Sequence, residues 1–412
     1  MSTKRGKAII SPKVRRLAAD IHGATIRKFT AAAWKILAHL RLASPPRGEL
    51  VVFDQAGSDR LLAYAFDGLH PAVLPVRYEE VYAGPAVLWR CLLNLRHIRE
   101  LKLRQLYKVY LLSCLELTGA RVVATWVDNS VYFQELSRLY PAQFIAMQNG
   151  YRTIQSVTNP SQHPRGWLSD AARWGSVLRL PHFFCFGAHT EELYRRYGHE
   201  IGKAYPLGSF LAGYYKTELD PGRAPIEHDL CLISEWRRGI MMGQDYPKVR
   251  RGLDALHANL ARYAVDRKVR VTVALCSGDP DEAAAFRALF AGAAQLIAHE
   301  RFSCYRTMDR SDVSISFFST AAFEAFGWGS KTLLCNYSGD ELLTCPIPGP
   351  WSLEGGDYLA FCDKLDALRA MPREVFEAES AQARRQLMGF DPERPPHREI
   401  RRLAESFLEG SC

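Results

Sequence analysis

Asp128 is the first candidate for chemistry in the sequence. It follows the apolar run 122–127, and a short amphipathic stretch comes after it. A carboxylate here could take a proton from an acceptor hydroxyl, or attack a sugar as a nucleophile, because sugar transfer passes through a cationic state. Asp128 suits the N-cap of the following helix equally well. Asp54, after the apolar run 50–53, is a weaker catalytic candidate of the same kind.

A second polar cluster, Gln148-Asn149-Gly150, follows the apolar run 144–147, and Arg152 comes soon after. The amide groups of Gln148 and Asn149 suit hydrogen bonds to sugar hydroxyls. We predict Asn149 as a catalytic residue and Gln148, Gly150 and Arg152 as substrate contacts. The alternative is a plain Asn-Gly turn.

Ser319 and Thr320 form the most specific local signal in the carboxyl-terminal half. An apolar run breaks at this Ser-Thr pair, which is typical of a helix N-terminus. The free amides and the dipole of such a terminus favour the phosphate of a nucleotide. Glu324, about one turn later, could accept hydrogen bonds from ribose hydroxyls. The alternative is an ordinary cap with Glu324 in solvent.

Two more strand ends in this half carry polar residues. Ser234 and Arg237 follow one apolar run, and Ser277 and Gly278 follow the next. Arginine could offset phosphate charge, and Ser277 and Gly278 could bring backbone donors close. We predict all four as donor contacts, against the alternative of solvated loops.

These clusters need parallel strands to position them. Two apolar strands, each ending in polar residues and joined by a helix, form a βαβ unit. The carboxyl ends of its strands share one edge of the sheet, where ligands bind in open α/β folds. The predicted strands are 50–53, 72–76, 122–127, 144–147, 182–186 and 204–207 in the first half, and 230–233, 269–275, 296–298, 313–317 and 332–335 in the second.

The predicted fold class is α/β, with two Rossmann-like domains. A chain of 412 residues is too long for one compact core. The linker composition of residues 217–227 marks the boundary. The predicted regions are a basic appendage at 1–47, an acceptor domain at 48–216, a donor domain at 228–356 and carboxyl-terminal helices at 357–412.

The positive charge is confined to one end of the chain. The formal charge is +9, and residues 1–47 hold eleven Lys or Arg against one Asp, or +10, so the remainder sums to −1. A nucleic-acid-binding body is therefore not expected. Residues 12–42 have the spacing of a basic amphipathic helix, which either packs on the body or contacts anionic lipid.

Several classes of site and location are disfavoured. Metal-ligand spacing, a G-x-G-x-x-G turn and a Walker loop are absent, and the ten cysteines are scattered. With no apolar run long enough to span a membrane and no signal core, we expect a cytoplasmic protein. The long irregular piece 153–180 could be a lid over a ligand, and it contains His163 and Arg165, which are bystanders otherwise.

Six short motifs, in this order, resemble the bacterial surface-carbohydrate (O-antigen) biosynthesis proteins, which are similar to GT-B glycosyltransferases. The resemblance covers about residues 48–370 and implies that the two Rossmann-like domains face a central cleft. It also implies a nucleotide-sugar donor bound by Ser319, Thr320 and Glu324, with Asp128 near the acceptor and no required metal. The motifs are Phe53-Asp54-x-x-Gly57, Val127-Asp128-Asn129-x-x-x-Phe133, Ile145 to Arg152, Leu207-Gly208-Ser209-Phe210, Ile233-Ser234, and Asp312 to Gly329 with Ser319, Thr320 and Glu324.

The sequence leaves the donor nucleotide open. Relatives that use CMP-activated acidic sugars often carry a His-Pro pair in the donor domain, but here such pairs occur only at His70-Pro71 and His163-Pro164. A CMP- or UDP-linked donor both remain candidates.

We expect a glycosyltransferase that acts on a lipid-linked or oligosaccharide acceptor. The alternatives are a CDP-polyol phosphotransferase of the same architecture and a non-catalytic envelope-assembly scaffold. A hexosamine-nucleotide epimerase is disfavoured because the expected cluster of carboxylates and histidines is missing.

Overall fold

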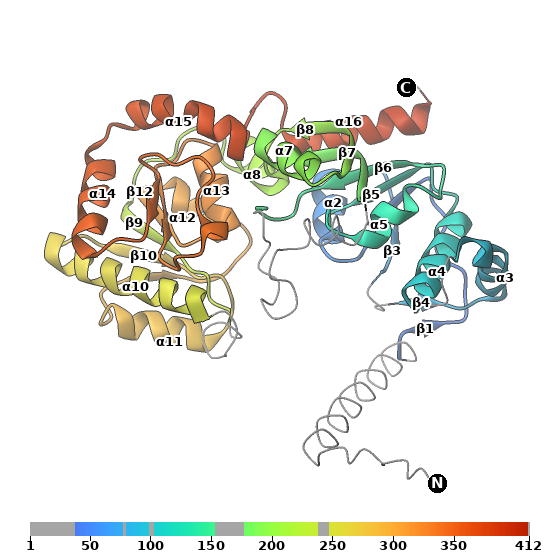
Figure 1. Cartoon of the computed structure of the whole chain (residues 1–412), viewed down its shortest axis with the longest axis horizontal. Coiled ribbons are helices and arrows are strands. Elements are labelled where there is room, and N and C mark those ends of the chain that lie inside the picture. The colour runs from blue at the N-terminus through green and yellow to red at the C-terminus, as the bar shows by residue number, and fades with distance from the viewer. Residues whose placement is uncertain (1–37, 77–79, 99–102, 153–176, 238–246, 411–412) are drawn as a thin grey trace, which may run out of the picture.

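Two parallel six-stranded sheets, each with helices around it, form the protein (Figure 1). The structure is a computed structural model that describes residues 38–76, 80–98, 103–152, 177–237 and 247–410. The first sheet has the strand order β3-β2-β5-β6-β7-β8, and the second has the order β11-β10-β9-β12-β13-β14. Both are Rossmann-like, as predicted.

The first domain alternates strands and helices, and a short β1–β4 pair lies beside its sheet. Its elements are β1 (Leu40–Arg41), β2 (Leu50–Phe53), α2 (Ser58–Tyr64), β3 (Ala72–Leu74), β4 (Val81–Tyr82), α3 (Pro85–Asn94), η1 (Leu95–His97), α4 (Leu103–Thr118), β5 (Val122–Thr125), α5 (Val131–Leu136), β6 (Gln143–Met147), β7 (Arg179–Cys185), α7 (Ala188–Arg196), β8 (Glu200–Pro206), α8 (Phe210–Tyr214) and the π-helix η2 (Tyr215–Leu219).

The second domain also alternates strands and helices. Its elements are β9 (His228–Ile233), α10 (Pro247–Arg267), β10 (Val271–Ala274), α11 (Pro280–Leu289), β11 (Gln295–Ile297), α12 (Ser303–Asp309), β12 (Ser311–Ser316), α13 (Thr320–Gly327), β13 (Thr332–Asn336), η3 (Glu341–Leu343), β14 (Ser352–Glu354), α14 (Tyr358–Ala370) and α15 (Arg373–Leu387), and α16 (Pro396–Glu409) ends the chain.

The central strands are apolar without interruption because helices cover both faces of each sheet. In β2, Val51 and Phe53 belong to the core under α4, α5 and α7, whereas Leu50 and Val52 belong to the core on the opposite face. All four side chains are buried. Neighbouring residues of one strand thus hold helices on opposite sides of the sheet.

The last helix, α16, packs on the first domain although it follows the second one in sequence. Ile400 and Ala404 are fully buried in the same core as Leu50 and Val52, next to α2 and α8. Figure 1 shows α15 leading back from the second domain and α16 lying beside β6 and β8. The end of the chain therefore completes one face of the first sheet and ties the two domains together.

The strands predicted from apolar runs form at their expected places, with ends that shift by at most four residues. The strand β14, which pairs in parallel with β13, and the β1–β4 pair were not predicted. The predicted linker 217–227 begins inside the π-helix η2, where Lys216 is buried and ion-paired with Asp309 at 2.9 Å. Among the described residues, no helix combines the length and apolarity needed to cross a bilayer.

Substitutions at two glycines test the contact between Gly208 and Gly389, where the chain returns from the second domain to the first. Gly208 has φ +93°, and a Cβ atom there would lie 1.8 Å from the Gly389 carbonyl oxygen; Gly198 has φ +75° with open space around it. We expect G198A to cost about 1–2 kcal/mol of unfolding free energy from backbone strain alone. G208A should cost roughly 1–3 kcal/mol more because of the clash. Urea unfolding measures both, and equal losses would show that the Gly208–Gly389 contact contributes little.

Candidate active site

A cavity of about 730 Å³ lies between the two domains, at the carboxyl ends of their strands. Both walls contain residues predicted from the sequence. Its lining residues are Arg60, Trp126, Gln148, Asn149, Gly150, Tyr151, Arg152, Phe186, Ser209 and Leu211 from the first domain, and Ser234, Glu235, Trp236, Arg237, Cys276, Tyr305, Phe318, Ser319, Thr320, Ala321, Glu324 and Leu343 from the second.

The second-domain wall is the N-terminus of α13. Ser319 is the N-cap, and its hydroxyl accepts from the Ala321 amide at 3.3 Å. Half-buried Glu235 accepts from the Phe318 amide and the Ser316 hydroxyl, both at 2.7 Å. The side chains of this turn thus engage several of the amides that the sequence analysis expected to be free for an anion.

Glu324 lines the cavity one turn inside α13, on the same helix face as Thr320. It accepts hydrogen bonds from the Ser209 hydroxyl of the first domain and from Tyr305, whose hydroxyl is 2.6 Å from Oε2. Burial raises the pKa of Glu324 from 4.5 to about 7, although Ser209, Tyr305 and Arg60 oppose that rise. Such a carboxyl exchanges its proton near neutral pH.

The first-domain wall is organised by a buried ion pair between Asp128 and Arg152. The carboxylate accepts from Arg152 at both oxygens and from the Tyr194 hydroxyl at 2.8 Å. Burial favours the neutral form of Arg152, but the neighbouring Asp128 outweighs this effect and the pKa of Arg152 is raised. Arg152 also donates to the Asn149 side-chain oxygen at 2.6 Å. The pair therefore fixes Asn149 and Arg152 at the cavity edge.

Asp128 itself is fully buried and is not among the residues that line the cavity. Its two oxygens hold Arg152 and Tyr194, which leaves an acceptor hydroxyl no route to them in this arrangement. The direct catalytic role stays a prediction, and the geometry favours a positioning role. The helix α5 that follows is capped by Ser130, whose hydroxyl accepts from the Phe133 amide, and not by Asp128.

Gln148 has a similar supporting role. Its side-chain oxygen accepts from the Phe186 amide at 2.8 Å, and its amide group donates to the Gly150 carbonyl oxygen at 2.9 Å. The side chain thus braces the turn that carries Asn149 and Gly150, and joins it to the end of β7.

The two walls touch at Tyr151. Its ring stacks on Phe323 of α13 with centroids 3.6 Å apart and planes 7° apart, and its amide donates to the Thr320 hydroxyl at 3.0 Å. A Cβ atom on Gly150 would lie 3.7 Å from that same hydroxyl oxygen. The Gln148–Arg152 turn and the α13 N-terminus therefore lie side by side, as the sequence predicted.

The other predicted donor contacts divide into two groups. Ser234 and Arg237 line the cavity, whereas Ser277 and Gly278 do not. Fully buried Glu282 accepts from the Ser234 and Ser277 hydroxyls and from the Ser277 amide at 2.9 Å. Glu282 thus ties the ends of β9 and β10 together, and Ser277 is part of that support.

Asp54 lies away from the other candidates. It lines a separate cavity of about 430 Å³ in the first domain, together with Tyr107, Asn129, Ser130 and Tyr132 among others. Its φ is +81°, and its carboxylate accepts from the Ala56 amide at 3.1 Å. Asp54 therefore shapes the loop after β2 and is not grouped with Asn149 or Glu324.

Thirteen of the cavity residues were absent from the predicted site, among them Arg60, Trp126, Ser209 and Tyr305. Arg60 lies on α2, just after a predicted strand end, and its guanidinium is 5.4 Å from the Trp126 ring centroid. Ser209 belongs to the motif Leu207-Gly208-Ser209-Phe210 and is the N-cap of α8. Tyr305 is on α12, and nothing in the local sequence distinguishes it from a core aromatic residue.

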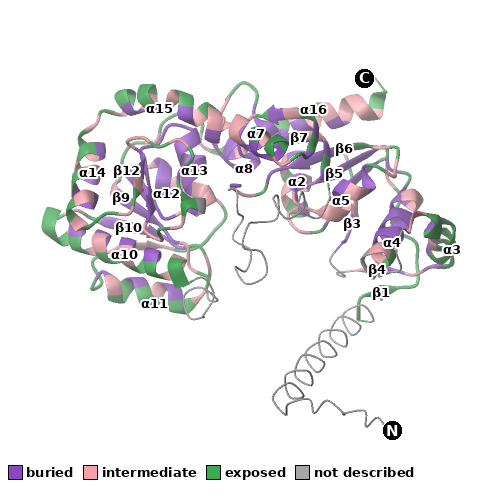
Figure 2. Cartoon of the chain, viewed as in Figure 1, coloured by how far each residue is buried: buried purple, intermediate pink, exposed green. Residues whose placement is uncertain are grey.

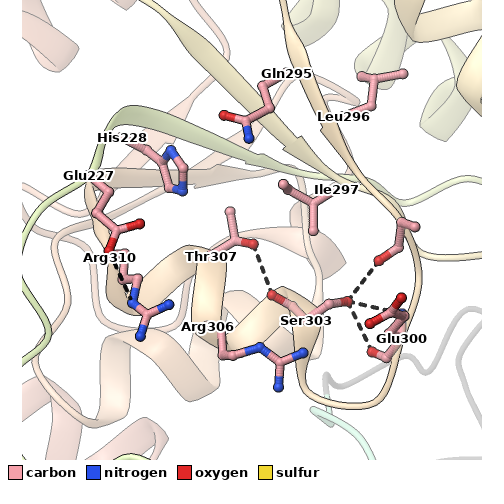
Figure 3. Close-up of a pocket in the computed structure, with 11 residues that line it drawn as sticks. Glu227, His228, Gln295, Leu296, Ile297, Glu300, Ser303, Arg306, Thr307 and Arg310 are labelled. Atoms are coloured by element: carbon pink, nitrogen blue, oxygen red, sulfur yellow. Dashed lines mark hydrogen bonds and ion pairs between the residues drawn. The ribbon is translucent and has the colours of Figure 1, made fainter.

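Figure 3 shows a third cavity, of about 360 Å³, between α12, β11 and the start of β9. It shares no residue with the cavity between the domains. Its polar groups bond to one another: Arg310 pairs with Glu227 at 3.6 Å, and the Ser303 hydroxyl donates to the Ala298 and Glu300 carbonyl oxygens. None of the predicted site residues lies there.

Some predictions concern residues that the structure does not describe. His163 and Arg165 lie outside the described residues, and so does most of the predicted helix 12–42. For metals, the described part of the chain contains no group of three or more His, Cys, Asp or Glu side chains arranged to hold an ion.

Comparison with known proteins supports the fold. No protein-family model and no curated protein sequence matches the chain. A putative UDP-N-acetylglucosamine 2-epimerase from Listeria monocytogenes has a similar structure, with a TM-score of 0.54 and 12% identity over 88% of this chain and 97% of that one. The predicted class, two Rossmann-like domains facing a cavity, is confirmed.

Two further solved structures match more distantly. Sucrose-phosphate synthase from Thermosynechococcus elongatus gives a TM-score of 0.49 and 14% identity over 88% of this chain and 100% of its own. The wall teichoic acid polymerase TagF gives 0.48 and 12% identity over 98% of this chain and 99% of its own. The resemblance to surface-carbohydrate biosynthesis proteins stays a prediction.

A double-mutant cycle tests the role of Asp128. D128N should lower the free energy of unfolding by about 3–5 kcal/mol, because it leaves the Arg152 charge buried without its partner. D128N/R152M should recover part of that loss. Urea unfolding of the four proteins gives the coupling energy. A D128N protein as stable as wild type would contradict the positioning role and restore the direct catalytic one.

The raised pKa of Glu324 predicts a pH-dependent stability difference. The folded pKa, about 7, exceeds the unfolded value of 4.5, so the native state holds an extra proton between them. Relative to E324Q, wild type should lose on the order of 3 kcal/mol as pH rises from 4.5 through 7. Urea unfolding from pH 4.5 to 8 measures this, with E393Q as the exposed-carboxylate control. A constant difference would show that Glu324 keeps an ordinary pKa.

Proposed function

We propose that this protein is a glycosyltransferase that moves a sugar from a nucleotide-sugar donor to a growing bacterial surface polysaccharide. The observation that carries the proposal is the cavity between the domains, where a helix N-terminus and three arginines, Arg60, Arg152 and Arg237, surround one space. This combination suits a diphosphate, because arginine side chains and the positive end of a helix dipole both favour phosphate oxygens.

The donor would bind along α13. Thr320 and Glu324 are one turn apart on the same helix face, so phosphates beside Thr320 would place the ribose near Glu324. A carboxylate offers about four lone-pair positions, and Ser209 and Tyr305 take two of them. The remaining positions of Glu324 could accept from ribose hydroxyls. Ser234 and Arg237 would complete the donor side.

The acceptor would approach from the first domain. Asn149 and Arg152 face the donor side, and the separate cavity near Asp54, with Asn129, Ser130 and two tyrosines, offers polar groups suited to sugar hydroxyls. We propose a lipid-linked or oligosaccharide acceptor. Asp128 would act by holding Arg152 and Asn149 in place.

The leaving diphosphate would be stabilised by the arginines and α13, with no resident metal required. Closure of the two domains would exclude water from the sugar. The proposal places the reaction in the cytoplasm, where nucleotide sugars are made. Activity that survives EDTA would support metal-independent stabilisation.

A nucleotide panel tests the class of donor. We expect one of UDP, GDP, CMP or CDP to stabilise the protein by about 2.7 kcal/mol when present at 100 times its Kd. Thermal unfolding with each compound measures the effect. A response to CDP alone would favour the polyol-phosphate alternative, and no response to any compound would favour the scaffold.

A matched arginine pair tests the location of the donor. Arg237 lines the cavity between the domains, and Arg306 lines the cavity of Figure 3. Calorimetric titration should show that R237A weakens binding of the responding nucleotide roughly tenfold, since a hydrogen bond to a charged group contributes about 1.5–3 kcal/mol. R306A should bind as wild type does. The opposite pattern would move the donor to the Figure 3 cavity.

A further inference from the structure

The helix α3 and the first residue of η1, Leu95, expose a continuous apolar face. The exposed fractions are 57% for Leu88, 63% for Trp89, 61% for Leu92, 45% for Leu93 and 43% for Leu95. Leu88, Leu92 and Leu95 follow each other at helical spacing, and Trp89 and Leu93 lie next to them. These five residues are called the α3 face below. Figure 2 shows α3 as exposed at the outer edge of the first domain.

The opposite side of α3 packs against α4. Val87 is buried, and the Asn94 side chain donates to the Ser113 hydroxyl at 3.1 Å and to Glu116 at 2.9 Å, both on α4. Among the described residues, the contacts with α4 hold the helix through this side, and the α3 face does not pack within the first domain. A group of large apolar side chains left in water in this way marks an interaction surface.

The surroundings of the α3 face are basic. Arg90 on α3 and Arg96 on η1 are both exposed, and the described residues 85–98 contain no Asp or Glu. Arg90 is 3.5 Å from Glu116, which offsets only part of that charge. A second copy of the chain docked face to face would bring like charges together, which disfavours self-association.

The basic amino-terminal segment enters the described structure beside this helix. Residues 1–37 contain nine Lys or Arg and one Asp. Leu40 and Arg41 then pair with Val81 and Tyr82 of β4, and the Gly84 amide donates to the Ala43 carbonyl oxygen at 3.0 Å, directly before α3 begins. The basic amino-terminal sequence is therefore joined to the described structure next to α3.

We propose that the α3 face is a docking surface for a bilayer that contains anionic phospholipid. The leucines would enter the boundary between headgroups and acyl chains, Trp89 would lie at that boundary, and Arg90 and Arg96 would contact lipid phosphates. This site is separate from the cavity between the domains. It does not depend on the proposed transferase function, because lipid binding is measured without turnover.

Vesicle co-sedimentation of the full chain tests the proposal. Wild type should bind vesicles of phosphatidylcholine and phosphatidylglycerol at 7:3 and bind pure phosphatidylcholine more weakly. L88Q/W89Q/L92Q should lower the partition coefficient roughly tenfold or more. The matched control is V265Q/L359Q, which replaces two apolar residues of the second domain that are 76% and 68% exposed. It should bind as wild type does.

The outcomes separate the alternatives. Equal binding by wild type and the triple variant would overturn the proposal and assign any lipid contact to the amino-terminal segment alone. A wild type that ignores vesicles but dimerises by light scattering, with a monomeric triple variant, would make the α3 face a self-association surface. R96E, which keeps every apolar residue, should lose binding to the anionic vesicles only.

Discussion

The contact between Tyr151 and Phe323 is the interaction on which the site depends. Tyr151 comes directly after a strand end of the first domain, yet its ring is packed within the hydrophobic core of the second. An aromatic stack contributes about 0.5–1.5 kcal/mol beyond the area that it buries. The amide of Tyr151 also donates to the Thr320 hydroxyl. This contact therefore sets the spacing between the Gln148–Arg152 turn and the α13 N-terminus. The hydrogen bond from Ser209 to Glu324 holds the opposite side of the cavity.

Buried carboxylates shape the loops around the cavity more than they line it. Asp128 holds Arg152, Glu235 holds the turn before α13, and Glu282 joins the ends of two strands. Each is surrounded by donors, which is the condition under which a buried charge can be retained. Glu235 and Glu324 line the cavity, and burial raises the pKa of both carboxyl groups, that of Glu324 to about 7. These two carboxyl groups link protonation to the site.

Apolar runs in the sequence predicted most of the architecture because buried parallel strands leave a strong signal. Leu50–Phe53 was placed without error, and the facing of the Gln148–Arg152 and Ser319–Glu324 clusters followed from parallel strands. The strand Ser352–Glu354 was missed because it is three residues long and largely polar. The packing of α16 on the first sheet could not be predicted from its own sequence, because an amphipathic pattern does not show which surface the helix packs against.

The site was harder to predict because the type of a residue does not show where its side chain points. Asp128 stands at a strand end with the chemistry of a base, but its carboxylate is turned toward a buried arginine, and only coordinates reveal this. Tyr305 and Arg60 reach the cavity from helices whose place depends on tertiary packing. The amides before α13 were expected to be free, yet Glu235, eighty residues earlier in the chain, occupies one of them.

The central claim is that the cavity between the domains holds the nucleotide of the donor. A crystal soaked with the nucleotide that stabilises the protein tests it most directly. The account predicts phosphate density beside Thr320 and Arg237, with the ribose toward Glu324. Ordered nucleotide in the cavity of Figure 3, with the space between the domains left to solvent, would contradict it.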